Sequence, residues 1–154
     1  MLISKIVSGG QTGAPRAALD VAIELGIPHG GWTPKGRKTE DGRLPARYQL
    51  QEMATDSNEK RTERNVIESD GTLIISHGLL TGGSDYTRKM AEKHGKPWIH
   101  VDANWMSVEA ATVIITSWLS GSNIEVLNVA GPRASKDPKI YTTTKTILKA
   151  VLQS

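Results

Sequence analysis

Apolar residues along the chain alternate between short continuous runs and helical repeats. Short apolar runs predict buried strands, and apolar positions spaced three and four residues apart predict helices with one apolar face. Ala14, Ala18, Val21 and Leu25 share such a face in a predicted helix over 13–25. The other predicted helices are 61–68, 84–94, 106–119 and 138–152. The predicted strands are 2–8, 30–32, 72–76, 97–101 and 124–129.

Helices that follow strands in this order predict an α/β fold. We expect one domain over 1–154, built on a parallel sheet with helices on both faces. Such sheets bind ligands at the carboxyl ends of their strands. The residues that follow each strand are therefore the first candidates for a functional site.

The segment 33–60 shows little periodicity, and many of its residues are charged. A loop of this length inside a compact domain is usually functional or disordered. Tyr48, Leu50 and Met53 indicate that it is anchored to the rest of the chain. It has two interpretations, a flap that brings Lys35 and Arg37 over a ligand and a contact between subunits.

A glycine-rich turn follows the first predicted strand and opens the first predicted helix. It contains Gly9, Gly10, Gln11, Thr12 and Gly13. Glycines allow the backbone to approach a ligand closely, and a helix start offers unpaired N–H groups to an anion. The turn lacks the Gly-Lys-Ser/Thr ending of a phosphate-binding Walker A loop. It predicts an oxyanion site of another kind.

Two further turns lie at the same predicted edge, around 81–87 and 130–135. Three such turns at one edge favour a shared oxyanion site. Arg16, Arg61 and Arg133 are candidate forked donors to an oxyanion. The full set of candidate ligand-binding residues is Gly9, Gly10, Gln11, Thr12, Gly13, Arg16, Lys35, Arg37, Arg61, Asn65, Thr81, Gly82, Gly83, Ser84, Thr87, Gly131, Arg133 and Ser135.

Composition narrows the function classes. The 154 residues include no cysteine, which excludes disulfides, thiolate nucleophiles, zinc fingers and iron–sulfur clusters. Four scattered histidines predict no metal site, and a net charge of +3 gives little support for nucleic-acid binding. No apolar run reaches the length of a membrane helix and no signal peptide stands at the start, so we expect a cytoplasmic protein.

Several of these motifs, in this order, resemble the molybdenum cofactor carrier family. The resemblance covers nearly the whole chain, from Gly9–Ala14 and Arg16–Asp20 to Asn128–Arg133. Between them it includes the segments Gly30–Trp32, Pro34–Arg37, Glu40–Gly42, Pro45–Tyr48, Arg61–Glu63, Asn65–Val66, Ser69–Asp70 and Gly82–Gly83. It implies a Rossmann-like fold, a dimer or tetramer, and binding of molybdenum cofactor (molybdopterin). Molybdate and tungstate would be partial mimics, and molybdoenzymes would receive the cofactor.

The chain departs from the family pattern at Pro15, where an acidic residue is usual. Proline suits the first helical turn, so the departure bears on ligand choice rather than on fold. Two alternatives stay open, a phosphoribohydrolase-like enzyme and a nucleotide-sensing module. The hydrolase pattern needs a glutamate shortly after the second turn, and Glu92 comes too late. No nucleophile stands beside a base, and we expect Asp85 to accept backbone N–H bonds, so binding without catalysis is the expected outcome.

Overall fold

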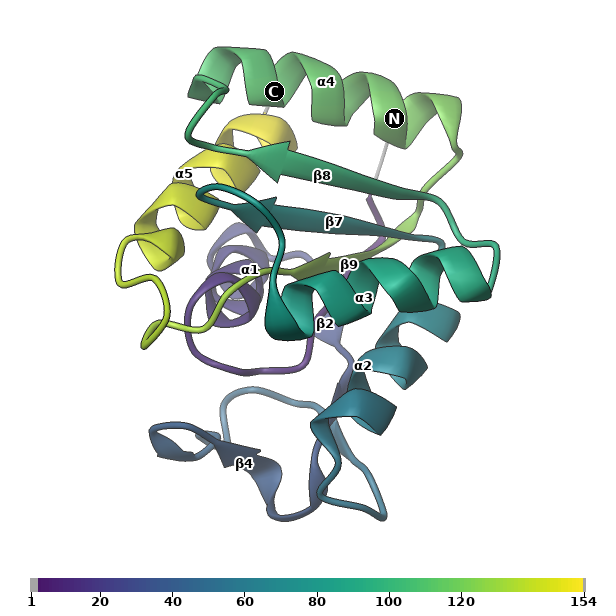
Figure 1. Ribbon diagram of the computed structural model, residues 1–154, viewed down its shortest axis with the longest axis vertical. Coiled ribbons are helices and arrows are strands. Elements are labelled where there is room, and N and C mark those ends of the chain that lie inside the picture. The colour runs from purple at the N-terminus through teal and green to yellow at the C-terminus, as the bar shows by residue number, and fades with distance from the viewer. Residues whose placement is uncertain (1–2, 154) are drawn as a thin grey trace.

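A five-stranded parallel sheet forms the centre of the computed structural model, which describes residues 3–153 (Figure 1). Its strands in spatial order are β2 (His29–Gly30), β1 (Lys5–Val7), β9 (Val126–Ala130), β7 (Gly71–Ser76) and β8 (Trp98–Asp102). All four pairings are parallel. The expected α/β fold with a parallel sheet is confirmed. The expected strand start at Leu2 lies outside the described residues.

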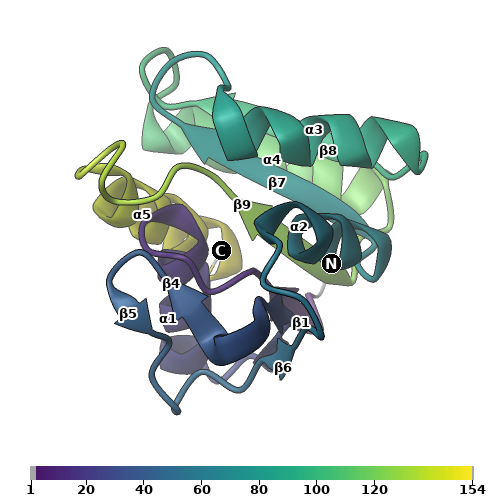
Figure 2. The same ribbon diagram turned by 60° about the horizontal axis from the view of Figure 1, so that its bottom comes forward.

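Helices cover both faces of this sheet (Figures 1 and 2). Three of them share the main apolar core with the strands: α1 (Ala14–Leu25), α4 (Val108–Gly121) and α5 (Ile140–Leu152). The opposite face carries α2 (Asn58–Ile67) and α3 (Gly82–Lys93), which pack on each other through Val66, Met90 and Ala91. The sheet between them is nearly closed from both sides.

Local sequence signals explain several helix ends. Pro15 lies in the first turn of α1, where a missing N–H costs no hydrogen bond, and Gly26 ends the helix in the left-handed conformation. Ser57 and Ser107 cap α2 and α4 through their side-chain oxygens. α2 therefore begins at Asn58, before the expected start at 61. This earlier start adds a turn that faces the edge of the sheet.

The segment 33–60 is not an unstructured loop. It contains strand β3 (Trp32–Thr33), the short 3-10 helix η1 (Lys35–Arg37), a hairpin of β4 (Lys38–Thr39) and β5 (Gly42–Arg43), and strand β6 (Gln51–Glu52). β3 pairs with β6 in parallel. The predicted strand 30–32 is broken at Gly31, whose φ is +119° and where a Cβ would lie 2.3 Å from the carbonyl oxygen of Ser8.

The segment 33–60 is anchored to the rest of the chain, as expected. Its apolar residues do not form the exposed surface that a contact between subunits would need. Leu44, Tyr48 and Leu50 pack on Leu19 of α1 and are buried within the chain. The Tyr48 hydroxyl donates to Asp20, which also accepts from Tyr141 of α5. The apolar residues of the segment are therefore unavailable for a partner.

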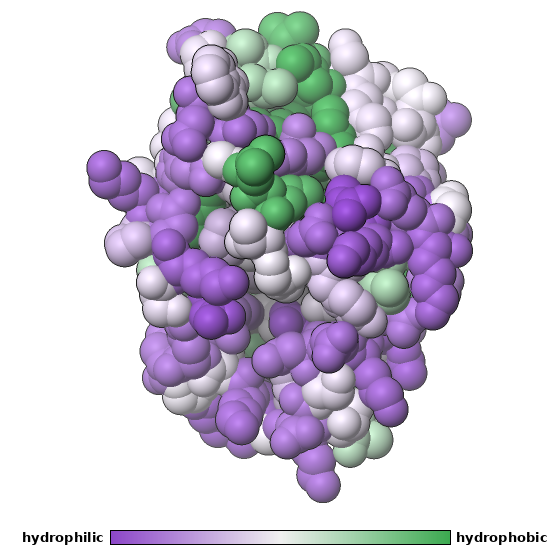
Figure 3. Space-filling model, viewed as in Figure 1, coloured by the Kyte–Doolittle hydropathy of each residue, from purple (hydrophilic) through white to green (hydrophobic). Residues whose placement is uncertain are grey.

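The outer surface is predominantly hydrophilic, with apolar side chains gathered in the upper half of the face shown in Figure 3. Val113 and Ile114 of α4 are among the exposed large apolar residues. Within residues 3–153, none of the helices has the length and apolar character that a membrane span requires.

Candidate functional site

A cleft of about 1230 Å³ opens at the carboxyl edge of the sheet. Its walls come from α2, α3 and the loops that follow β1, β7 and β9. This is the place that the topology of a parallel sheet favours for a ligand. Eleven of the predicted site residues line it: Gly9, Gln11, Arg61, Asn65, Thr81, Gly82, Gly83, Ser84, Thr87, Gly131 and Arg133.

Arg61 of α2 is the most informative charge in the cleft. Its guanidinium lies against Gly9, where an added Cβ would fall 1.5 Å from Nη1. Its Nε is fully buried without a hydrogen-bond partner, and no ion pair reaches the side chain within residues 3–153. Burial without an opposing carboxylate lowers the pKa of Arg61 to about 10. A buried cation without a partner is costly, which indicates a place prepared for an anion.

The start of α3 supplies a second set of donors to the cleft. The N–H groups of Gly82 and Gly83 belong to the first helical turn and have no partner within the described chain. A Cβ at Gly83 would meet no atom within 4 Å, so the backbone here is open to a ligand. The Lys136 ammonium lies close to Gly82: a Cβ added at Gly82 would be 2.7 Å from Nζ. Helix dipole, free N–H groups and ammonium together favour an anion.

Ser84 completes this open end. Its side chain is 8% exposed, and its hydroxyl has no hydrogen-bond partner in the part of the chain described. Thr87 lies one turn later, but its hydroxyl donates to the carbonyl of Gly83 at 2.9 Å. Of the two predicted hydroxyl donors on α3, Ser84 is the one that remains available to a ligand.

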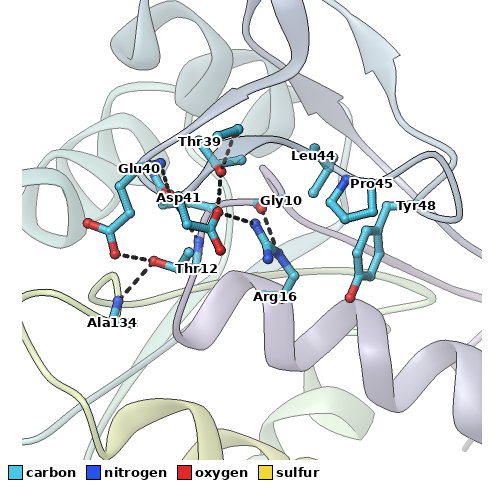
Figure 4. Close-up of polar contacts among 12 residues, drawn as sticks. Gly10, Thr12, Arg16, Thr39, Glu40, Asp41, Leu44, Pro45, Tyr48 and Ala134 are labelled. Atoms are coloured by element: carbon cyan, nitrogen blue, oxygen red, sulfur yellow. Dashed lines mark hydrogen bonds and ion pairs between the residues drawn. The ribbon is translucent and has the colours of Figure 1, made fainter.

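The part of the first glycine turn that leads into α1 is closed, because the chain's own Glu40 occupies the space beside Thr12 (Figure 4). The Glu40 carboxylate accepts hydrogen bonds from the hydroxyls of Thr12 and Ser135 and, at 3.0 Å, from the N–H of Ser135. It also forms an ion pair with Arg133 at 3.2 Å. Although burial opposes ionisation, the bonds from Ser135 and Thr12 outweigh it and lower the pKa of Glu40.

Backbone packing closes the same turn from another side. A Cβ at Gly13 would lie 2.3 Å from the carbonyl oxygen of Pro132, and the N–H of Ala14 donates to that oxygen at 3.1 Å. A Cβ at Gly10 would lie 2.9 Å from the side chain of Leu44. These glycines allow close packing of the first turn, the third turn and the segment 33–60. They do not face the cleft.

Four more predicted residues, Thr12, Ser135, Arg16 and Arg37, also lie outside the cleft lining. Arg16 donates to the carbonyl of Gly10 at 3.2 Å and pairs with Asp41 at 3.4 Å (Figure 4). Arg37 donates to the carbonyls of Leu44, Pro45 and Tyr48. Both arginines therefore hold the segment 33–60 in place.

Lys35 lies in a separate shallow depression with Gly36 and Asp56, so the flap does not bring it over the cleft. Asn65 reaches the cleft wall, but its amide is used by the backbone of Trp32, accepting at 2.8 Å and donating at 3.1 Å. The Trp32 ring lies under Arg64 instead of in the cleft. Neither Trp32 nor Tyr48 is placed to stack on a ligand there.

Asp85 does not accept the backbone N–H bonds that the sequence suggested. Its carboxylate pairs with Arg88 at 2.8 Å and Lys89 at 3.5 Å, because both cations lie one turn further along α3. The bond from Arg88 is the main reason that the pKa of Asp85 is lowered. Within residues 3–153, no group of three or more His, Asp and Glu side chains is arranged to hold a metal ion.

Sequence reasoning missed three residues that matter to this site. Glu40 was noted only as part of a motif, Lys136 not at all, and Asn128 only within the motif that ends at Arg133. Asn128 did carry a signal, since it is a polar residue inside an otherwise apolar strand. Glu40 carried none, because its partner Ser135 lies 95 residues away.

Comparison with known proteins gives two matches. The model of the circularly permutated YpsA SLOG family matches residues 6–152. Among solved structures, the crystal structure of the "Putative molybdenum carrier protein" from Syntrophus aciditrophicus SB is 58% identical in sequence. The match covers 97% of this chain and 95% of that chain, with a TM-score of 0.97. No curated protein matches the chain.

Proposed function

Because the chain belongs to the circularly permutated YpsA SLOG family, we propose that it is a carrier that binds molybdenum cofactor without transforming it. The proposal extends to this chain the role that the name of the 58% identical Syntrophus protein states. The observation that carries it is Arg61, a half-buried side chain whose buried Nε has no partner and which lines a cleft large enough for a pterin. The cofactor is the cargo of such a protein.

The residues of the cleft fit the terminal phosphate of the cofactor. Arg61 supplies a charged donor from one wall, and the N–H groups of Gly82 and Gly83 supply uncharged donors from the other. Ser84 and Lys136 lie beside them. A phosphate or a molybdate-like oxyanion bound there receives charge-assisted hydrogen bonds. In the cofactor the metal is held by the dithiolene of the pterin, so the protein needs no metal ligands of its own.

A nucleotide is the second candidate ligand, since it also joins a phosphate to a nitrogen-rich ring. The cleft gives little support to nucleotide hydrolysis. Glu59 and Asp137 are the carboxylates among its lining residues, and Asp137 is bound to Nδ1 of His77 at 2.6 Å. A water-activating base must lie within hydrogen-bond reach of the reacting atoms. A nucleotide-sensing module therefore remains a better alternative than an enzyme.

A carrier must also meet partners. We propose a homo-oligomer, a dimer or tetramer, as the family resemblance implies, and a molybdoenzyme as recipient of the cofactor. The contact surface proposed from the sequence, around Tyr48, Leu50 and Met53, is unavailable because these side chains are buried within the chain. Exposed Val113 and Ile114 of α4 offer a different apolar surface. A cytoplasmic location stays a prediction.

The test is to purify the protein from cells that synthesise molybdenum cofactor. Mass spectrometry would measure bound molybdenum, and fluorescence after oxidation would measure the released pterin. We expect both in the wild type and neither in Arg61→Met. Arg88→Met is the matched control, because it removes the same charge from a helix position outside the cleft. Wild-type protein free of molybdenum and pterin, or carrying a nucleotide instead, would contradict the carrier proposal.

A further inference from the structure

The floor of the cleft contains a buried amide that the anion site does not use. Asn128 lies on β9, the middle strand of the sheet, in register with Thr72 of β7 and Val7 of β1. It is 3% exposed and still lines the cleft. A polar side chain in the middle of a parallel sheet is unusual, because such strands are buried on both faces.

The orientation of Asn128 follows from its neighbours along β9. Leu127 and Val129 belong to the core beneath α1, α4 and α5. Because side chains alternate along a strand, Asn128 points to the other face, where α2 and α3 flank the cleft. Its Nδ2 donates to Oγ1 of Thr72 at 3.1 Å. The amide plane is thereby fixed by a neighbouring strand.

One end of this amide remains free. Oδ1 of Asn128 has no hydrogen-bond partner in the described chain, and the side chain borders the cleft. Oδ1 is open to the cleft, so a ligand can supply the missing donor, and a ligand without a donor there would leave the oxygen unpaired. The free oxygen therefore favours a ligand that carries an N–H group.

The position of Asn128 separates it from the anion site. It precedes Ala130, the last residue of β9, by two residues. At about 3.3 Å per residue, it lies about 7 Å deeper than the strand end. The N–H groups of Gly82 and Gly83 lie at the start of α3, beyond the end of β7. A ligand with its anion at the edge would place a ring over the amide.

We propose that Asn128 is a specificity-determining residue, which accepts a hydrogen bond from an N–H group, within the ring or on its exocyclic amine, of a phosphate-bearing nitrogen heterocycle. The anionic half of this ligand rests on the proposed function, whereas the ring half rests on Asn128 alone. Both candidate sources, a pterin and a purine, carry an amino group beside a ring nitrogen. Asn128 recognises the amino group that these two rings share.

Calorimetry with four probes tests the assignment: ribose 5-phosphate, AMP, neopterin monophosphate and phosphate-free neopterin. We expect one or both ring-bearing phosphates to bind wild-type protein at least tenfold more tightly than ribose 5-phosphate. Asn128→Leu should abolish that advantage and change ribose 5-phosphate affinity less than twofold. The relative affinities of AMP and neopterin monophosphate identify the source of the ring.

Asn128→Asp keeps an acceptor oxygen toward the cleft, and the Thr72 hydroxyl can donate to its other oxygen, which reverses the present bond. This variant should retain more of the ring preference than Asn128→Leu. Equal loss in the two variants would overturn the acceptor role, as would a ring preference that survives Asn128→Leu. If Asn128→Leu does not fold, Asn128→Ser takes its place, since it removes the amide without adding bulk. If ribose 5-phosphate fails to bind wild-type protein, the anion proposal falls. In that case, loss of phosphate-free neopterin binding in Asn128→Leu still supports the role of Asn128, and unchanged binding overturns it.

Discussion

Two glycine-rich turns open helices at the same edge of the sheet, and the chain uses them differently. Before α1, the turn is filled by the chain itself, with Glu40 bound to Thr12 and Ser135. Before α3, the N–H groups of Gly82 and Gly83 have no partner in the part of the chain described. Both turns have the backbone freedom of glycine. Within the described chain, Glu40 fills the space beside the first turn, whereas no atom would lie within 4 Å of a Cβ on Gly83.

A glycine-rich turn marks a place where another group comes close to the backbone, whether that group belongs to a ligand or to the chain itself. At α1 the approaching groups are Leu44, the Pro132 carbonyl and a carboxylate from the β4–β5 hairpin. At α3 a Cβ on Gly83 would meet no atom. The distribution of charge points the same way, since Glu40 pairs with Arg133 while Arg61 has no carboxylate partner within residues 3–153.

The largest expected effect is at the open turn, on Arg61→Met. Affinity for ribose 5-phosphate should fall on the order of 100-fold, since charge-assisted hydrogen bonds contribute about 1.5–3 kcal/mol. The melting temperature should rise, because a buried charge without a partner is removed. Calorimetry and thermal unfolding measure the two quantities.

Alkaline pH gives an independent check on the same side chain. Because burial lowers the pKa of Arg61 to about 10, wild-type affinity should fall as the pH rises through that value. Unchanged affinity in Arg61→Met would show that the guanidinium does not bind the anion. Arg88→Met should bind as the wild type does.

The next largest effect is on stability at the closed turn. Gly13→Ala forces a Cβ onto a residue with φ of +81°, 2.3 Å from the Pro132 oxygen. We expect the free energy of unfolding to fall by about 2–3 kcal/mol. Gly83→Ala is the control at the open turn and should change it by less than about 1 kcal/mol. Equal destabilisation by the two substitutions would contradict the conclusion that the first turn is closely packed and the second is open.

A larger side chain at the open turn should affect binding but not folding. We expect Gly83→Leu to weaken ribose 5-phosphate binding about tenfold, because the side chain fills the approach to the free N–H groups. Denaturant titration should give a nearly unchanged free energy of unfolding. Wild-type affinity in this variant would place the anion elsewhere in the cleft.

The smallest expected effect is the response of the closed turn to acid. The folded pKa of Glu40 lies below its ordinary value of 4.5, so its contribution to stability is present above that value. The contribution is lost as the pH falls through the lower folded value. Between about pH 5 and pH 3, the melting temperature of the wild type should fall more than that of Glu40→Gln. Parallel curves would show that the Glu40 carboxylate does not stabilise the turn.

Much of the fold could be predicted from the sequence because its signals are local. Helix α1 was placed within one residue by the spacing of its apolar residues and by Gly26. Strand β7, an apolar run bounded by Asp70 and His77, was placed equally well. The second glycine turn and Arg61 of the candidate cleft were also identified, since each carries its own residue type.

The rest depends on contacts between distant residues. Nothing near Thr12 shows that Glu40 comes to rest beside it, or that Arg37 is used by backbone carbonyls of its own segment. The short pairs β3–β6 and β4–β5 lack periodicity, because two-residue strands are too short to alternate. Distinguishing an open turn from a closed one needs the three-dimensional structure.

The bonds of Glu40 also bear on the order in which the molecule assembles. They join the β4–β5 hairpin to Ser135, 95 residues later in the chain. During synthesis, these bonds can form only after residue 135 of the 154 has been made. Closing such a long loop is entropically costly and is repaid only by contacts that form late. Completion of the Glu40 contacts is therefore a late step of folding, and a nascent chain that stops before Ser135 leaves that carboxylate without two of its donors.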